Sequence, residues 1–221
     1  MIRAVLFDLD GTLYDRDAVV LRVAHEQFDT FQGRLAGVDR DRFIARTLEL
    51  DDHGYARRVD VYRGLLSGRT VDERLAGDLE AHFWDCYCRH CDVPKDAAAT
   101  LEALRASGKT LAVVTNGPVE WQSRKLRTLG LAGYFDHVLI SEAEGISKPD
   151  PRIFVRALER CGVAPHEAMF VGDHPEIDVA GAKTAGLVPV WKRVPYWTLT
   201  RDDVLVIDRL NEILPSCLQQ A

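Results

Sequence analysis

The sequence lacks long apolar runs and long basic blocks. It has no stretch of about 18 uncharged apolar residues, and its N-terminus has no apolar run long enough for a signal peptide. Its 28 Lys and Arg residues are outnumbered by 34 Asp and Glu, and the net charge of −6 would repel the phosphate backbone of a nucleic acid. We therefore expect a cytoplasmic protein that binds neither membranes nor nucleic acids.

Cysteine is also scarce. The chain has five cysteines, an odd number at irregular spacing, and 221 residues are enough to bury a substantial core without disulfides. We expect all five thiols to be reduced. The composition, 47% hydrophobic and 28% charged, is ordinary for a soluble globular protein and excludes a disordered or fibrous chain.

Five short apolar runs each lead into a polar residue or a glycine, the pattern of fully buried parallel strands. They are AVLFDLDG, LAVVTNG, HVLISE, AMFVGD and VPVWK. Helical patterns separate them, and in one of these Asp150 caps a helix that Pro151 opens and Gly162 closes. Alternating strands and helices predict an α/β fold with a doubly wound, Rossmann-like parallel sheet.

Polar side chains stand where several of these strands end. Asp8 and Asp10 follow the first strand, Thr115 ends a second, and Asp173 follows another. Asp8 and Asp10 are two residues apart, so they would project to the same face of an extended strand. Like charges this close are costly, and a divalent metal ion is the simplest compensation. Ligands of doubly wound sheets bind beyond the carboxyl ends of the strands, so we expect the site there.

Residues 15–92 break the alternation of strands and helices. They show only the 3.6-residue period of amphipathic helices. The apolar positions that carry this period are Val20, Ala24, Phe28 and Phe31, then Tyr55, Val59, Tyr62 and Leu66. We predict an all-helical cap domain at 15–92, inserted into a core formed by 1–14 and 93–221. An insert that begins directly after the first carboxylate pair is well placed to act as a lid.

Four short stretches follow one another along the core. They are Asp8-Leu9-Asp10-Gly11-Thr12, Thr115-Asn116-Gly117, Ser147-Lys148-Pro149-Asp150 and Gly172-Asp173, with Asp178 five residues further on. Together they resemble the haloacid dehalogenase superfamily, in particular its phosphatase branch with a helical cap after the first strand. A lone Asp-x-Asp pair would be weak, whereas four signals in this order are strong. The resemblance spans the core from Ile2 to 206–210, and the cap shows no signature of the family.

The resemblance implies a phosphatase that forms a covalent intermediate. Asp8 would attack phosphorus to give an aspartyl phosphate, and Asp10 would protonate the leaving oxygen and then deprotonate the incoming water. Mg²⁺ would be held by the carboxylates of Asp8 and Asp173 and by the backbone carbonyl of Asp10. Asp178 would support that shell or bind through water.

The resemblance also implies that Thr115, Asn116 and Lys148 bind phosphate, in a small phosphorylated metabolite. Taken singly, these residues have ordinary explanations. Thr115-Asn116-Gly117 can be a turn at the end of a strand, and Lys148 a solvated surface charge. Their joint occurrence, in order and at strand ends, favours the functional interpretation.

Three other functions stay open at this point. A phosphotransferase or phosphomutase on the same scaffold would use the same residues and differ only in the acceptor. A 2-haloacid dehalogenase needs neither a metal nor the second aspartate, so Asp10 and Asp173 argue against it. A catalytically silent binding protein is disfavoured by the intact set of catalytic side chains. The sequence selects no particular substrate and no oligomeric state.

A second cluster of ligating residues occurs within the predicted cap. His82, Cys86 and His90 lie at successive four-residue spacings, as in some zinc sites. Cys86 also continues an apolar stripe with Leu75, Leu79 and Phe83, and no partner pair of ligating cysteines lies elsewhere in the chain. We therefore favour a buried, non-ligating Cys86, and we interpret His53-Gly54 as a plain turn.

Overall fold

The computed structural model describes residues 1–35, 37–68 and 74–218. The chain forms two compact units, one from Met1–Tyr14 and Asp92–Ala221 and the other from Asp15–Cys91. We call them the sheet unit and the helical unit. Among the helices of the described residues, none has the length and apolar character needed to cross a bilayer.

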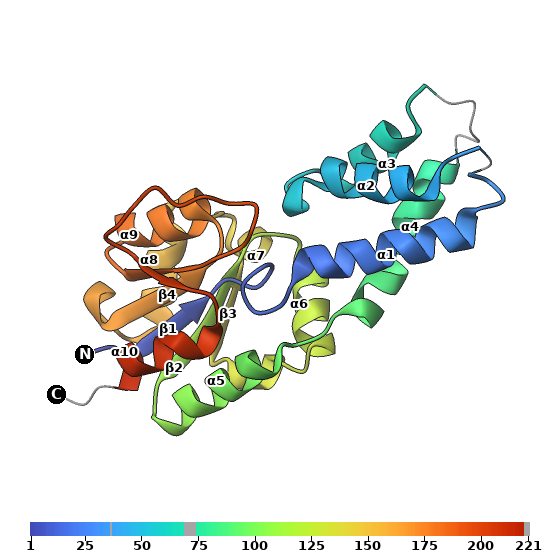
Figure 1. Ribbon diagram of the computed structural model, residues 1–221. Coiled ribbons are helices and arrows are strands. Elements are labelled where there is room, and N and C mark those ends of the chain that lie inside the picture. Colours follow the sequence, from blue (N-terminus) through green and yellow to red (C-terminus); the bar gives the residue numbers. More distant parts are fainter. Residues whose placement is uncertain (36, 69–73, 219–221) are drawn as a thin grey trace. The chain divides into compact units, whose positions relative to one another are not determined.

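The sheet unit is built on six parallel strands in the order β3-β2-β1-β4-β5-β6 (Figure 1). They are β1 (Ala4–Phe7), β2 (Thr110–Thr115), β3 (His137–Ile140), β4 (Ala168–Gly172), β5 (Val188–Lys192) and β6 (Leu205–Ile207). All five predicted strands are present, and the predicted doubly wound α/β fold with a helical insert is confirmed. The sequence reasoning missed β6, a three-residue edge strand, although Val204-Leu205-Val206-Ile207 is a short apolar run.

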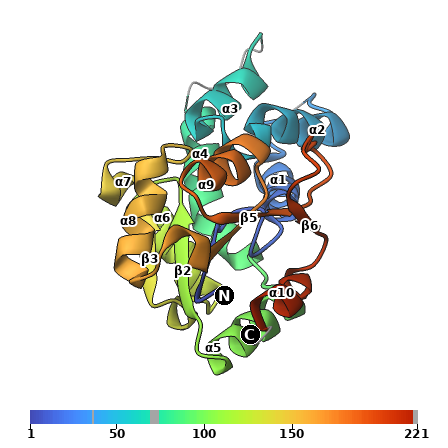
Figure 2. The same ribbon diagram turned by 90° about the vertical axis from the view of Figure 1, so that its left-hand side faces the viewer.

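Helices cover both faces of this sheet. They are α5 (Lys95–Ala106), α6 (Val119–Thr128), α7 (Ser141–Glu144), α8 (Pro151–Cys161), α9 (Gly181–Thr184) and α10 (Leu214–Leu218). In both views α8 lies beside α9, and α5 lies beside α10 (Figures 1 and 2). The predicted ends of α8 are confirmed, because the Asp150 side chain accepts from the Arg152 amide and Gly162 adopts φ 64°.

The strand order determines where the site lies. From β1, in the middle of the sheet, the chain runs to β2 and β3 on one side and then to β4, β5 and β6 on the other. The carboxyl ends of β1, β2 and β4 are therefore neighbours, and a doubly wound sheet binds its ligands where the strand order reverses. Asp8, Thr115 and Asp173 lie at these three ends.

The helical unit contains α1 (Arg16–Phe31), α2 (Arg40–Asp51), α3 (Arg58–Leu66) and α4 (Leu75–Tyr87). Each helix packs on the next, and α4 packs back on α1. The predicted stripe through Tyr55 and Val59 is wrong, because Tyr55 is 50% exposed and precedes α3, whose buried apolar residues are Val61, Tyr62 and Leu66. The cause is a left-handed turn after α2, with Asp52 at φ 47° and His53 at φ 51°, so the period does not run through one helix.

One buried carboxylate in the helical unit is fully compensated. Asp51 accepts from the Arg16 guanidinium at 2.5 and 3.0 Å and also from Arg58. The Arg58 guanidinium also lies over the Phe83 ring, 3.7 Å from its centroid. Burial disfavours the charged carboxylate, but the two arginines outweigh it and hold the pKa of Asp51 below its usual value.

Candidate active site

Three carboxylates meet at the carboxyl end of the sheet. Asp8 directly follows β1, Asp173 directly follows β4, and Asp178 lies in a π-helical turn at Pro175–Ala180. One carboxylate oxygen from each lies within 4.8 Å of the others, and all three residues are buried. The structure therefore brings together three residues that the sequence placed in one site. Single π-turns are frequent at functional sites, and this one carries Asp178.

Lys148 supplies the positive charge among these carboxylates. Its ammonium donates to Asp8 Oδ1 at 2.6 Å and to Asp178 Oδ1 at 2.7 Å, and the residue is only 5% exposed. The side chain is therefore no solvated surface charge. Within the described residues, three carboxylates here meet one ammonium, which leaves an excess of negative charge.

This excess is reflected in the pKa values. Burial, with smaller contributions from the neighbouring carboxylates, raises the pKa of Asp8 to about 7, although Lys148 opposes the shift. Burial and the charges of Asp178 and Asp8 raise the pKa of Asp173 to about 9. The pKa of Lys148 is also raised, because its two carboxylate partners outweigh its burial. The cluster therefore favours an additional cation or bound protons.

The Asp-x-Asp-Gly-Thr segment packs directly against Asp173. Gly11 adopts φ 82°, and a Cβ there would lie 2.6 Å from Asp173 Oδ2, so this position requires glycine. Thr12 Oγ1 lies 3.4 Å from both Asp8 Oδ2 and Asp173 Oδ1 and can donate to one of them at a time. Trp191, on β5, holds the backbone of Asp173, because its indole donates to the Asp173 carbonyl at 2.6 Å. Sequence reasoning assigned no role to Thr12 or Trp191.

The Asp10 side chain belongs to a different set of contacts. Of the described residues, those whose carboxylates gather within 4.8 Å at this sheet end are Asp8, Asp173 and Asp178, without Asp10. The Asp10 carboxylate accepts from Lys125 Nζ at 2.7 and 2.8 Å, from Gln122 at 2.9 Å and from the Tyr14 hydroxyl. Strand β1 ends at Phe7, so the alternation that would align Asp8 with Asp10 does not continue that far.

Gln122 and Lys125 are residues that sequence reasoning missed. Both lie on α6 and are 2% and 8% exposed. The Gln122 amide also donates to Thr115 Oγ1 at 2.6 Å, so it links the end of β2 to Asp10. The sequence does contain a hint of this role. Gln122 precedes the apolar Leu126 by one helical turn, so it is a polar residue on the face of the helix that points to the core.

The end of β2 also positions Lys148. The Asn116 side chain accepts from the Lys148 amide and donates to the Lys148 carbonyl, both at 2.9 Å. Its side chain therefore fixes the backbone that carries the ammonium. Thr115 is 1% exposed, and next to it the Gly117 amide donates to the Ser141 hydroxyl at 2.9 Å.

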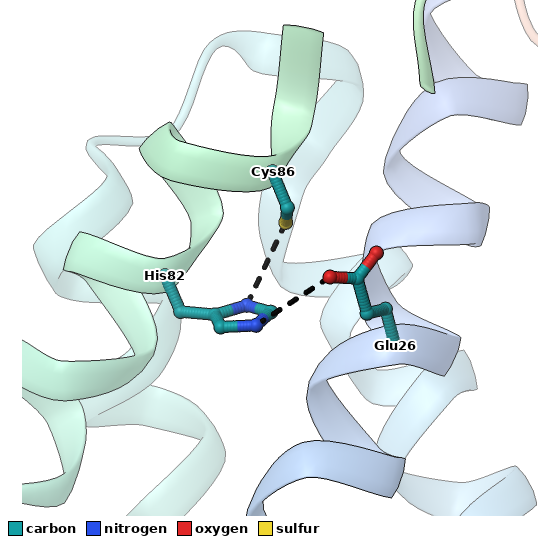
Figure 3. A group of neighbouring side chains, drawn as sticks. All are labelled: Glu26, His82 and Cys86. Atoms are coloured by element: carbon teal, nitrogen blue, oxygen red, sulfur yellow. Dashed lines mark hydrogen bonds and ion pairs between the residues drawn. The ribbon is translucent and has the colours of Figure 1, made fainter. Parts of the chain in front are cut away.

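The second cluster from the sequence lies in the helical unit. Cys86 is fully buried on the face of α4 that also carries Leu75, Leu79 and Phe83, as predicted. Burial raises the pKa of the Cys86 thiol to about 12. Glu26 of α1 lies beside His82 and Cys86, a neighbour that no pattern in the sequence indicates (Figure 3).

Curated proteins of similar sequence include several phosphatases. The glyceraldehyde 3-phosphate phosphatase of Methanopyrus kandleri is 32% identical, in a match that covers 97% of this chain and 96% of that protein. The phosphoserine phosphatase of Thermus thermophilus is 51% identical, in a match that covers 61% of this chain and 53% of that protein.

Solved structures show the same fold. The 2-haloacid dehalogenase from Pseudomonas syringae pv. Tomato is 31% identical, with a TM-score of 0.66 and coverage of 99% of this chain and 98% of that one. The HAD-hydrolase YfnB from Bacillus subtilis, bound to magnesium, is 22% identical, with a TM-score of 0.78 and coverage of 99% of both chains.

Residues 2–186 match the haloacid dehalogenase-like hydrolases as a family. This range contains the four stretches on which the resemblance was based, from Asp8 to Asp178. The resemblance is thereby confirmed, and the chain belongs to the haloacid dehalogenase-like hydrolase family.

Proposed function

We propose that this hydrolase is a Mg²⁺-dependent phosphatase that cleaves a small phosphate monoester through an aspartyl phosphate on Asp8. One observation carries the proposal. Three buried carboxylates lie within 4.8 Å of one another, and Lys148 supplies a single ammonium among them in the described part of the chain. Such a cluster suits a cation together with a phosphoryl group, whose charges complement those of the side chains.

The donor set fits Mg²⁺. The available atoms are carboxylate oxygens, which this ion prefers, and the raised pKa values of Asp8 and Asp173 indicate a need for positive charge. Asp8 and Asp173 would hold the ion with the Asp10 backbone carbonyl, and Asp178 would support them. When bound, Mg²⁺ would neutralise charge on the phosphoryl oxygens.

The protein's own groups would act in two steps. In the first, an Asp8 carboxylate oxygen forms a bond to phosphorus, the bond to the leaving oxygen breaks, and Asp10 gives that oxygen a proton. In the second, Asp10 takes a proton from water, the water oxygen attacks phosphorus, and the Asp8 carboxylate leaves. Lys148 and the Thr115 hydroxyl would hold the phosphoryl oxygens.

Contacts in the structure support separate duties for Asp8 and Asp10. Asp8 is held by Lys148 at 2.6 Å inside the acidic cluster, whereas Asp10 is held by Gln122 and Lys125 outside it. A nucleophile must point at phosphorus, and a general acid must reach the leaving oxygen instead. The two sets of contacts are consistent with this division.

Dehalogenation of a 2-haloacid is the second candidate, favoured by the 31% identity to a solved dehalogenase. It would use Asp8 as a nucleophile on carbon. That reaction gives no reason for burying Asp173 and Asp178 at Asp8, so the acidic cluster favours phosphate ester hydrolysis. A phosphotransferase would use the same groups with another acceptor in place of water.

The substrate is proposed from the relatives. The proteins of similar sequence are named for glyceraldehyde 3-phosphate and phosphoserine, both small phosphate monoesters. We propose a metabolite of comparable size, and we propose that the helical unit serves as a cap whose side chains select it. In this proposal, the binding groups of the core contact the metal and the phosphate, and every candidate substrate carries the same phosphate. They therefore cannot select one substrate over another.

A panel assay tests these proposals. The purified chain is incubated with glyceraldehyde 3-phosphate, phosphoserine, phosphoglycolate and an aryl phosphate, with Mg²⁺ or with a chelator, and free phosphate is measured. We expect release that depends on Mg²⁺ and is absent in Asp8→Asn. Halide release from a 2-haloacid without phosphate release would favour the dehalogenase, and transfer to a sugar hydroxyl would favour the phosphotransferase.

A further inference from the structure

Glu26, His82 and Cys86 form a second cluster of ligating groups, wholly within the helical unit (Figure 3). His82 and Cys86 lie one turn apart on α4, and Glu26 faces them from α1. One ligand atom from each residue lies within 4.8 Å of the other two. The two helices therefore converge on a carboxylate, an imidazole and a thiol, three different donor types.

The donor atoms of the three side chains lie close enough together to be drawn onto one metal ion. Cys86 Sγ lies 3.6 Å from His82 Nδ1, and His82 Nε2 lies 3.6 Å from Glu26 Oε1. With bonds of about 2.0 to 2.3 Å to a tetrahedral ion, ligand atoms lie about 3.3 to 3.8 Å apart. His82 faces Cys86 with Nδ1 and Glu26 with Nε2, and one imidazole nitrogen alone can bind, so the ring and its two neighbours would rotate to bring all three donors onto one ion.

Neighbouring groups orient the carboxylate. His90 Nε2 lies 2.6 Å from Glu26 Oε2, and the Arg89 guanidinium lies 2.5 Å from Oε1. Arg89 also donates to the Asp85 carbonyl at 3.2 Å and is 60% exposed, so its guanidinium can turn into solvent when a cation binds Glu26. These two contacts make an ordinary ion-pair cluster around Glu26, but they do not involve Cys86, whose sulfur faces His82 (Figure 3).

The cluster combines access with burial. The side chains of Glu26 and His82 are 31% and 19% exposed, so an ion can enter from solvent. Cys86 is fully buried. A thiolate and a carboxylate together would balance the charge of a divalent ion, and the neutral imidazole would add no charge.

We propose that Glu26, His82 and Cys86 bind Zn²⁺, with water as the fourth ligand and His90 orienting Glu26. Sulfur and nitrogen donors favour zinc over Mg²⁺, which takes oxygen ligands. On binding, the zinc–sulfur bond forms and the Cys86 thiol releases its proton to water. The ion would join α1 to α4.

Cobalt spectroscopy tests the site in the full-length protein. Metal-free protein is titrated with Co²⁺, and the near-ultraviolet band of thiolate-to-cobalt charge transfer is recorded. We expect the band at one equivalent, and its loss in Cys86→Ala. Cys91→Ala is the matched control, because Cys91 lies in the same segment and its thiol donates to the Tyr87 carbonyl. Absence of the band from the wild type, or its loss in Cys91→Ala with retention in Cys86→Ala, would overturn the proposal.

Two further variants separate this site from the acidic cluster of the sheet unit. Asp8→Asn should keep the cobalt band, since no cysteine belongs to that cluster among the described residues. Glu26→Gln keeps Cys86 and its burial but loses the anionic oxygen. We expect it to weaken Zn²⁺ binding at least tenfold, a loss that even outer-shell changes can cause. Equal Zn²⁺ affinity in Glu26→Gln and wild type, by competition with a chromophoric chelator, would contradict the ligand set.

Discussion

The two units each bury a cluster of charged side chains, but their charges balance in opposite ways. In the helical unit one carboxylate, Asp51, faces two guanidinium groups, and its pKa is lowered. In the sheet unit three carboxylates share the Lys148 ammonium, and the pKa values of Asp8 and Asp173 are raised. In the first cluster the cationic groups outnumber the carboxylate, and in the second the carboxylates outnumber the ammonium.

The difference separates a structural cluster from a functional one. Burying charge costs several kcal/mol per ion, and a fold repays this when every ion has a partner. The Asp51 cluster meets that condition and joins α1, α2 and α3 through Arg16 and Arg58. In the Asp8 cluster every ion has a partner only when a cation is added. The cost of burying these carboxylates is therefore explained if the site binds a cation. The same Asp→Asn substitution should therefore affect activity in the Asp8 cluster and stability in the Asp51 cluster.

The largest expected effect is on turnover in Asp8→Asn. The amide keeps the shape of the side chain but cannot attack phosphorus, so phosphate release should fall by at least about 10⁴-fold. Steady-state assays with excess Mg²⁺ measure this, and circular dichroism with thermal unfolding checks the fold. Activity within tenfold of the wild type, after repurification, would exclude Asp8 as the nucleophile.

Asp51→Asn should act on stability instead. The change removes the carboxylate that Arg16 and Arg58 share, and breaking such a buried cluster costs about 3 to 5 kcal/mol. Urea unfolding, with the free energy extrapolated to water, measures the loss. A loss below about 1 kcal/mol would show that the cluster is no better compensated than a surface ion pair.

Lys125→Met tests the contacts of Asp10. Methionine keeps the length of the side chain but removes the two bonds to the Asp10 carboxylate. We expect kcat to fall about 10- to 100-fold for an alkyl phosphate, a part of the contribution of a general acid. The deficit should be smaller for an aryl phosphate, whose leaving group needs less protonation.

The neighbouring Arg124 supplies a control for this variant. It lies on α6 beside Lys125 and contacts the Trp121 ring rather than Asp10, so Arg124→Met should leave kcat near that of the wild type. Equal losses for alkyl and aryl esters in Lys125→Met, with phosphorylation of Asp8 rate-limiting for both, would argue that Lys125 does not act through Asp10.

Much of the fold and part of the site followed from local patterns. Buried parallel strands are short apolar runs, and their polar ends mark one edge of the sheet, so Asp8 and Asp173 could be placed there, whereas Lys148 was assigned through the family resemblance. The direction of the Asp10 side chain did not follow, because strand alternation stops at Phe7.

The residues that were missed depend on how helices pack. Gln122 and Lys125 reach Asp10 only because α6 turns that face inward, and Glu26 meets His82 only because α1 packs on α4. A helical period shows which residues share a face, but not which residue of another helix lies opposite. The error at Tyr55 has a related cause, because a left-handed turn at Asp52 and His53 interrupts an apparent period.

The smallest expected effect is on the pH dependence of stability in metal-free protein. Asp8 and Asp173 have folded-state pKa values of about 7 and about 9, against an ordinary value of 3.8 for an aspartate side chain. Between roughly pH 4 and pH 9 the folded protein therefore binds more protons than the unfolded chain, and the free energy of unfolding falls as pH rises. Urea unfolding with a chelator present measures this fall.

Three comparisons assign this slope to the acidic cluster. Asp8→Asn should flatten it, because one of the two titrating carboxyls is gone. Mg²⁺ should also flatten it, because the cation takes over the role of the protons. Asp51→Asn should leave it unchanged between about pH 5 and pH 9, because the lowered pKa of Asp51 places its own contribution at acid pH, where stability is lost as pH falls. A slope in Asp8→Asn as steep as in the wild type would mean that the excess negative charge is not centred on Asp8, and the contrast between the two clusters would then need another source.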